Sequence, residues 1–110
     1  MVLMIDGRSL ETTEQGFLCS LEDWDEEVAV QIALQQGIEL TEAHWEIIHF
    51  QRDYYIRFRH LPNSRMFVKV IRNSLGAEKG SSRYLQRLFP EGPLKYACMI
   101  AGLPKPPTCL

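Results

Sequence analysis

The sequence predicts a mainly α-helical fold that begins with a small β-hairpin. An Asp-Gly pair at 6–7 stands between apolar or alternating runs, which is the strongest short-range signal for a hairpin. Farther along, capping residues and Gly or Pro breakers delimit several segments with helical apolar spacing. The 110 residues are 45% apolar, enough for one small domain with a single core. We expect one domain over 1–110, with a hairpin and helix at 1–40, an orthogonal bundle of helices at 41–102 and a mobile arm at 103–110.

The region after the hairpin is expected to enter the core and then to start a helix. A turn followed by Phe17 indicates a side chain plugged into the core, and Cys19 is most simply a small buried apolar residue. Ser20 and the acidic run at 22–27 are typical of a helix N-terminus, where the helix dipole favours anions. This acidic run is therefore interpreted as the start of a helix and not as a metal site. Gly37 should end the helix.

Four more helices follow from the same local rules. Thr41 caps a long helix that reaches about His60 and should be the central packing helix. Its wide apolar and aromatic face consists of Trp45, Ile48, Phe50, Tyr54, Tyr55 and Phe58. Pro62 then breaks the chain, and the remaining helices are expected at 65–75, 83–89 and 93–101, the last with proline at its first position.

A helix, a tight turn that contains glycine and a second basic helix also indicate a helix-turn-helix in the C-terminal part. A DNA-binding regulator is therefore one candidate function. However, the pI of about 5.9 is far from the basic balance of DNA-binding modules. No set of base-reading side chains gathers on one face, so direct nucleic-acid binding is the weaker alternative.

The charges divide unequally along the chain. Residues 1–64 hold twelve acids and four bases, whereas residues 65–110 hold eight bases and two acids. A positive field lowers the pKa of a thiol from about 8.5 and steers acidic partners or phosphates toward it. A solvated basic face without a special role is the plainer interpretation.

Metal, cofactor and membrane roles find no support in the sequence. His44, His49 and His60 are five and eleven residues apart, which does not gather them on one helical face, so we expect ordinary helix-surface or helix-end residues. The three cysteines form no zinc-spaced cluster and favour thiol chemistry instead. The first residues lack a signal-peptide pattern, and no run approaches the roughly 18 apolar residues of a membrane span. We expect a cytoplasmic protein without metal or cofactor.

The last thirteen residues carry the candidate chemistry. A helix cannot continue past Gly102, because the three prolines that follow lack backbone donors, so an extended, polyproline-like arm is predicted. Such an arm would let the Cys109 thiol enter the active site of another protein. The simpler interpretation is that Cys109 is a free cysteine in a frayed C-terminal tail. Eleven residue steps separate Cys98 from Cys109. At roughly 3.3 Å per residue the arm can also fold back and bring the two sulfurs together.

Nucleophilic transfer is the chemistry that these residues support. The thiolate of Cys109 would attack a donor persulfide, hold the terminal sulfur and pass it to an acceptor. Lys105 with Arg83 or Arg87 would favour the thiolate, whereas the C-terminal carboxylate would oppose it. Cys98, partly buried on its helix, is either a resolving thiol or a core cysteine.

Three segments and the penultimate cysteine identify a family. The segments read Glu-Lys-Gly-Ser-Ser-Arg-Tyr-Leu from 78, Leu-Phe-Pro-Glu-Gly-Pro from 88 and Ile-Ala-Gly-Leu-Pro-Lys-Pro from 100. With them the chain resembles, essentially end to end, the DsrC/TusE family of sulfur-carrier proteins. The resemblance implies a small, mainly helical domain with a hairpin, a helix-turn-helix-like core and a flexible arm, in which Cys109 accepts sulfane sulfur as a persulfide.

The resemblance leaves two branches open. In the TusE branch the carrier takes sulfur from a TusBCD complex and works with the thiouridylase MnmA to make 2-thiouridine at the tRNA wobble position. In the DsrC branch the arm serves dissimilatory sulfite reductase as its gamma subunit, and Cys98 forms a disulfide or trisulfide link with Cys109. Cys98 matches the two-cysteine pattern usual in DsrC, whereas the segment at 83–90 is closer to the TusE version. Either branch implies a protein carrier of sulfur rather than an enzyme with a substrate pocket.

Overall fold

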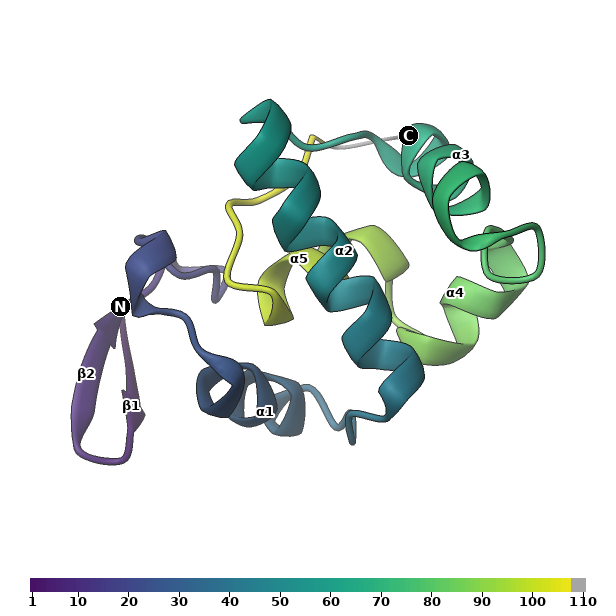
Figure 1. Cartoon of the computed structure of the whole chain (residues 1–110). Helices are drawn as coiled ribbons and strands as arrows, with labels where there is room; N and C mark the ends of the chain where they lie inside the picture. The colour runs from purple at the N-terminus through teal and green to yellow at the C-terminus, as the bar shows by residue number, and fades with distance from the viewer. Residues whose placement is uncertain (108–110) are drawn as a thin grey trace.

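The computed structural model describes residues 1–107 and is mainly helical, as predicted (Figure 1). In this part of the chain an antiparallel hairpin precedes a short 3-10 turn and five α-helices. Their bounds are β1 Val2–Ile5, β2 Arg8–Glu11, the 3-10 turn Leu21–Asp23, α1 Glu26–Gln35, α2 Glu42–Phe58, α3 Ser64–Leu75, α4 Ser82–Leu88 and α5 Pro93–Ile100.

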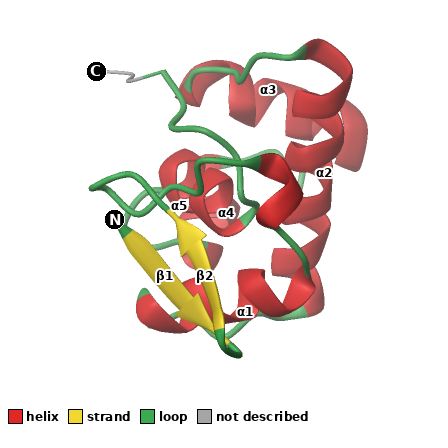
Figure 2. Cartoon of the chain, turned by 90° about the vertical axis from the view of Figure 1, so that its left-hand side faces the viewer, coloured by secondary structure: helices red, strands yellow, loops and turns green. Residues whose placement is uncertain are grey.

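The hairpin forms at the predicted place. Strand β1 pairs with β2 in a register that sets Ile5 opposite Arg8. The two turn residues, Asp6 and Gly7, have φ of 49° and 80°, the left-handed conformation that a two-residue hairpin turn requires. Ile5 and Leu10 are buried, and Figure 2 shows the hairpin along one edge of the helices. The hairpin therefore covers one face of the helical core.

Two expectations for the next region are wrong. Ser20 does not cap α1 but precedes the 3-10 turn. Helix α1 begins at Glu26, where the Asp25 side chain accepts a hydrogen bond from the Val28 amide at 2.9 Å and caps the helix. Cys19 is exposed rather than buried. The preceding residue, Leu18, bridges to Thr12 in extended backbone and is buried, so the next side chain turns away from the core.

The predicted aromatic face of α2 is only partly buried. The buried residues of the helix are His44, Ile47, Ile48 and Gln51, and of the predicted face Ile48 alone is among them. Trp45, Phe50 and Tyr55 pack half-buried against the core, whereas Phe58 is 48% exposed. His44 is also not a surface residue. Its Nδ1 accepts from the Thr41 amide at 3.1 Å, which leaves Nε2 to donate to the Leu88 carbonyl at 2.7 Å. The helical period at 44, 47, 48 and 51 defines the buried face, and Phe58 is exposed because it is the last residue of the helix.

Helix α5, not α2, is the central element. It contacts each of the helices α1, α2, α3 and α4, and five of its residues are buried. Both views show it between the other helices (Figures 1 and 2). The predicted Pro93 start is confirmed, and the helix ends at Ile100, just before Gly102. The position of α5 is therefore fixed by contacts with the four other α-helices of the described chain.

Candidate functional site

Cys98 lies in the core near the end of α5. Its side chain is 0% exposed, so the expectation of partial burial is wrong. Burial raises the pKa of Cys98 to about 12, although a hydrogen bond from Gln51 Nε2 at 3.3 Å acts in the opposite direction. At neutral pH this sulfur is a protonated thiol, and it cannot act as a nucleophile where it lies.

Gln51 is the polar partner of this thiol. It reaches Cys98 from α2 and is itself fully buried. Its Oε1 atom has no hydrogen-bond partner among the residues that the structure describes. An unpaired buried amide oxygen costs about 1–3 kcal/mol, so the interface of α2 and α5 holds a destabilising polar group beside the thiol.

Two side chains hold the end of α5, and we name them the α5 clamp. Trp24 Nε1 donates to the Ile100 carbonyl at 2.8 Å, and Arg52 Nη1 donates to the Ala101 carbonyl at 2.7 Å. The Arg52 guanidinium also lies 4.1 Å from the centroid of the Trp24 ring. Burial lowers the pKa of Arg52, with the charge of Asp53 opposing the shift. These donors satisfy carbonyls that a helix end leaves unpaired, and the cation suits the negative end of the helix dipole.

Gly102 fixes the direction in which the chain leaves α5. The Leu103 amide donates to the Cys98 carbonyl and the Gly102 amide to the Met99 carbonyl, the pair of bonds that defines a Schellman motif. Gly102 has φ of 70°, and a Cβ there would lie 2.4 Å from Trp24 Cδ1. Only glycine fits between the helix end and the indole. Since Leu103 is fully buried, the root of the arm is anchored.

The described part of the arm is 103–107. Pro106 is buried, whereas Pro104, Lys105 and Pro107 are exposed. The arm lines a hollow of about 220 Å³, whose residues are Ser64, Gly92, Pro93, Leu94, Lys95, Lys105, Pro106 and Pro107. The predicted carrier residue, Cys109, lies outside the described residues.

The predicted basic residues do not gather in one place. Lys105 lies in the arm hollow together with Lys95. Arg83 and Arg87 are exposed on α4 and line a separate shallow hollow with Ser82 and Gln86. The structure therefore sets Lys105 on the arm and the two arginines on α4, in hollows that share no lining residue.

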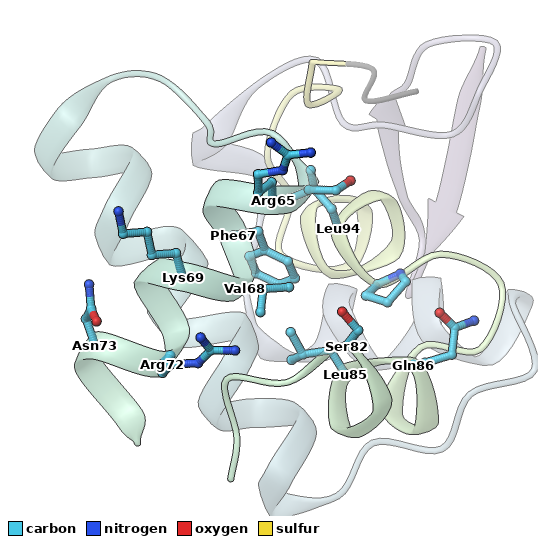
Figure 3. Close-up of a pocket in the computed structure, with 12 residues that line it drawn as sticks. Arg65, Phe67, Val68, Lys69, Arg72, Asn73, Ser82, Leu85, Gln86 and Leu94 are labelled. Atoms are coloured by element: carbon cyan, nitrogen blue, oxygen red, sulfur yellow. The ribbon is translucent and has the colours of Figure 1, made fainter. Parts of the chain in front are cut away.

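A larger groove opens between α3, α4 and the start of α5 (Figure 3). We name it the basic groove. Its volume is about 720 Å³, and it is lined by Ser64, Arg65, Phe67, Val68, Lys69, Arg72, Asn73, Ser82, Leu85, Gln86, Pro93 and Leu94. It shares Ser64, Pro93 and Leu94 with the arm hollow. The two sites are therefore neighbours.

Sequence reasoning missed both the groove and the clamp. The groove had a detectable signal, because Arg65, Lys69 and Arg72 are spaced four and three residues apart and share one face of α3. The clamp had none. Trp24 and Ile100 are 76 residues apart in the chain.

Within residues 1–107, no trio of His, Cys, Asp or Glu side chains could hold a metal ion. None of the helices in the same range combines the length and the apolar character needed to cross a bilayer.

Comparisons with known proteins agree with one another. The model of the family described as "DsrC like protein" matches residues 4–110. The sulfurtransferase TusE of Sodalis glossinidius is 52% identical over 105 residues, covering 96% of this chain and 97% of that protein. The sulfurtransferase TusE of Escherichia coli is 49% identical over 109 residues, covering 99% of this chain and all of that protein.

Solved structures give the same result. The NMR structure of Allochromatium vinosum DsrC has a TM-score of 0.90 and 46% identity, with both chains fully covered. The crystal structure of the oxidized gamma-subunit of the dissimilatory sulfite reductase (DsrC) from Archaeoglobus fulgidus has a TM-score of 0.85 and 43% identity, again with full coverage of both. These relatives support a sulfur-carrier role.

Proposed function

This chain belongs to the DsrC-like protein family, and from that premise we propose that it carries sulfane sulfur between proteins as a persulfide on Cys109. The observation that supports the choice of cysteine is the burial of the other candidate. Cys98 is enclosed and protonated, whereas the arm leaves the core after Leu103 and is exposed at Pro107. Cys109 is two residues farther along the chain.

The transfer is an exchange between sulfur atoms. The Cys109 thiolate attacks the outer sulfur of a donor persulfide, and a new S–S bond forms as the donor's S–S bond breaks. The donor cysteine leaves as a thiolate, and Cys109 now carries the –S–SH group. The acceptor thiolate repeats the same attack, which returns Cys109 to the thiolate.

Lys105 is the basic residue that we assign to this step. It lies four residues before Cys109 on the same arm, and its positive charge favours the thiolate over the thiol. Arg83 and Arg87, which lie on α4, are assigned to contacts with a partner instead.

We propose that the sulfur goes to tRNA modification in the cytoplasm, with a TusBCD-like donor and an MnmA-like acceptor that makes 2-thiouridine at the wobble position. The basis is that about half of the aligned residues are identical to those of proteins named sulfurtransferase TusE.

A second candidate is a role as gamma subunit of a dissimilatory sulfite reductase. Its basis is the presence of Cys98 and the likeness to DsrC structures. In that role the Cys98 thiolate attacks the inner sulfur of the Cys109 persulfide, which forms a Cys98–Cys109 disulfide and releases the outer sulfur as hydrosulfide. Because Cys98 is fully buried, this reaction requires the last turn of α5 to open first.

Intact-protein mass spectrometry after incubation with inorganic polysulfide tests the proposal. The expected result is a gain of about 32 Da, one sulfur atom, on the wild-type protein. Because Cys19 is exposed and can react with polysulfide as well, the comparison is made in the Cys19→Ser background. The gain should be present in Cys19→Ser and in Cys19→Ser with Cys98→Ser, and absent from Cys19→Ser with Cys109→Ser. Loading that survives in this last variant would overturn the assignment.

A further inference from the structure

The basic groove is a second candidate site, separate from the thiols. We propose that it is the docking site for an acidic, amphipathic segment of the protein that gives sulfur to Cys109 or takes it. This inference rests on the proposed carrier function and adds to it the surface and the chemistry by which the partner is recognised.

The groove has an apolar floor and a cationic rim. The floor is formed by Phe67 and Val68 from α3, Leu85 from α4 and Leu94 from α5. Figure 3 shows Phe67, Val68 and Leu85 between the helices, with Arg65 and Arg72 beside them and Lys69 farther out on α3. A surface of this kind fits a helix that presents leucine-like side chains to the floor and carboxylates to the rim.

The positive charge of the rim is not neutralised within the described chain. Arg65, Lys69 and Arg72 line the groove, and no Asp or Glu does. The ion pairs in residues 1–107 are Arg8–Asp25, His49–Glu26 and Lys79–Glu46, none of which includes a groove residue. Arg72 is held in place because its Nε donates to the Gly80 carbonyl at 3.1 Å. The rim therefore attracts a carboxylate-rich partner through uncompensated charge.

The apolar floor favours a peptide over a nucleic acid. A phosphate backbone is recognised by cations on a polar surface and gains nothing from four buried or half-buried apolar side chains. A peptide helix buries its own apolar face there, and this burial is the main favourable contribution to protein association.

The groove lies where a docked partner would be useful. It shares Ser64, Pro93 and Leu94 with the hollow that the arm lines as far as Pro107. Three residues follow Pro107, a span of about 10 Å when extended. The residues after Pro107 are therefore long enough for Cys109 to reach a partner that is bound in the groove.

Fluorescence anisotropy with a labelled model peptide tests the inference. The probe is a helical peptide of about fourteen residues, with leucines at i, i+3 and i+4 spacing and glutamates elsewhere. We expect Lys69→Glu to weaken peptide binding about tenfold, because it reverses one rim charge. The matched control is Arg57→Glu, an equal charge reversal at an exposed position of α2 outside the groove, which should change binding less than about twofold.

Several outcomes would overturn the inference. They are absence of peptide binding by the wild type, an equal loss in Arg57→Glu, and binding of single-stranded RNA or duplex DNA at the groove with no binding of the peptide. Concentration-dependent dimerisation that Lys69→Glu abolishes would also overturn it, since a second copy would then occupy the groove.

Polysulfide loading separates this inference from the carrier function. A small donor needs no docking, so Lys69→Glu should load Cys109 as fully as the wild type. If the wild type fails to load, the carrier function fails whatever the peptide does. If loading is normal and transfer from a protein persulfide donor is equally fast in Lys69→Glu and wild type, the docking inference alone fails.

Discussion

The first turn of α5 opens on the basic groove and the arm hollow, whereas its last turn is buried and held by the α5 clamp. At the first turn, Pro93 and Leu94 line both of these surface features. At the last turn, Cys98 is enclosed and the carbonyls of Ile100 and Ala101 accept bonds from Trp24 and Arg52. One rigid helix of eight residues thus connects a surface suited to a partner with the anchor of the arm.

The last turn of α5 should therefore contribute to folding stability, whereas the surface around the first turn should contribute to binding. Polar groups of the last turn have partners inside the protein, so losing one leaves a buried group unpaired and costs folding free energy. Side chains around the first turn face a groove, and Lys69 there makes no hydrogen bond or ion pair within residues 1–107, so replacing it leaves no internal group unpaired. Changes at the two ends of α5 should therefore be detected by different measurements.

Cys98 should react extremely slowly with iodoacetamide in the native protein. Its pKa of about 12 against 9.0 for an unperturbed thiol lowers the thiolate fraction about a thousandfold at pH 8, and burial blocks access as well. Exposed Cys19 is the internal control and should be alkylated readily. Peptide mass mapping of the alkylation time course makes the comparison, and similar rates at both cysteines would contradict the enclosure of Cys98.

The raised pKa of Cys98 also predicts a pH dependence of stability. Because the folded pKa lies above the unfolded one, the protonated thiol contributes fully below about pH 9, and this contribution is lost as the pH rises toward 12. Urea unfolding across this window should show a steeper loss for the wild type than for Cys98→Ala. Parallel curves would indicate that the thiol does not titrate in this way.

Gly102→Ala should lower the free energy of unfolding by about 3 kcal/mol or more, because the new Cβ would overlap the Trp24 ring. Gly37→Ala is the matched control. Gly37 has φ of 73°, close to the 70° of Gly102, but nothing lies within 4 Å of its added Cβ. It should therefore lose only the roughly 1–2 kcal/mol that left-handed backbone costs. Equal losses in urea unfolding would mean that the indole does not confine Gly102.

Trp24→Phe should cost about 1–3 kcal/mol, since it keeps an aromatic ring but leaves the Ile100 carbonyl without its donor. Trp45→Phe is a suitable control, because Trp45 is half-buried on α2 and stacks on His49 without holding α5. Thermal and urea unfolding of both variants would test the clamp. A Trp24→Phe protein as stable as the wild type would show that the indole donor contributes nothing.

Lys69→Glu, in the basic groove, should change the free energy of unfolding by less than about 0.5 kcal/mol, as is usual for an exposed side chain without an internal partner. The effect of this substitution should instead be detected as weaker peptide binding. A large loss of stability would place Lys69 in the fold instead of in a docking surface.

Local signals were enough to predict most of the secondary structure. Asp6 and Gly7 form the hairpin turn, Thr41 and Pro93 begin helices, and Gly102 follows the end of the last one. Each of these residues acts through its own backbone conformation or through bonds to its neighbours, which a sequence displays directly.

Contacts between distant segments explain most of what was not predicted. The central place of α5 and the Gln51 bond to Cys98 depend on packing between helices far apart in sequence. The start of α1 was misplaced for a local reason, because Ser20 and Asp25 are both good capping residues, and Ser20 precedes a short 3-10 turn while Asp25 caps α1. The carrier Cys109 came from the family resemblance and the composition of the arm, and it remains a proposal.

The position of the transferred sulfur can be measured directly in protein isolated from growing cells, with the thiols blocked at lysis and the peptides mapped by mass. We expect sulfane sulfur on the C-terminal peptide that contains Cys109, with Cys98 recovered as a plain thiol. Sulfane sulfur found on Cys98 or Cys19 while the C-terminal peptide carries none would contradict a carrier whose reactive cysteine lies at the end of the arm.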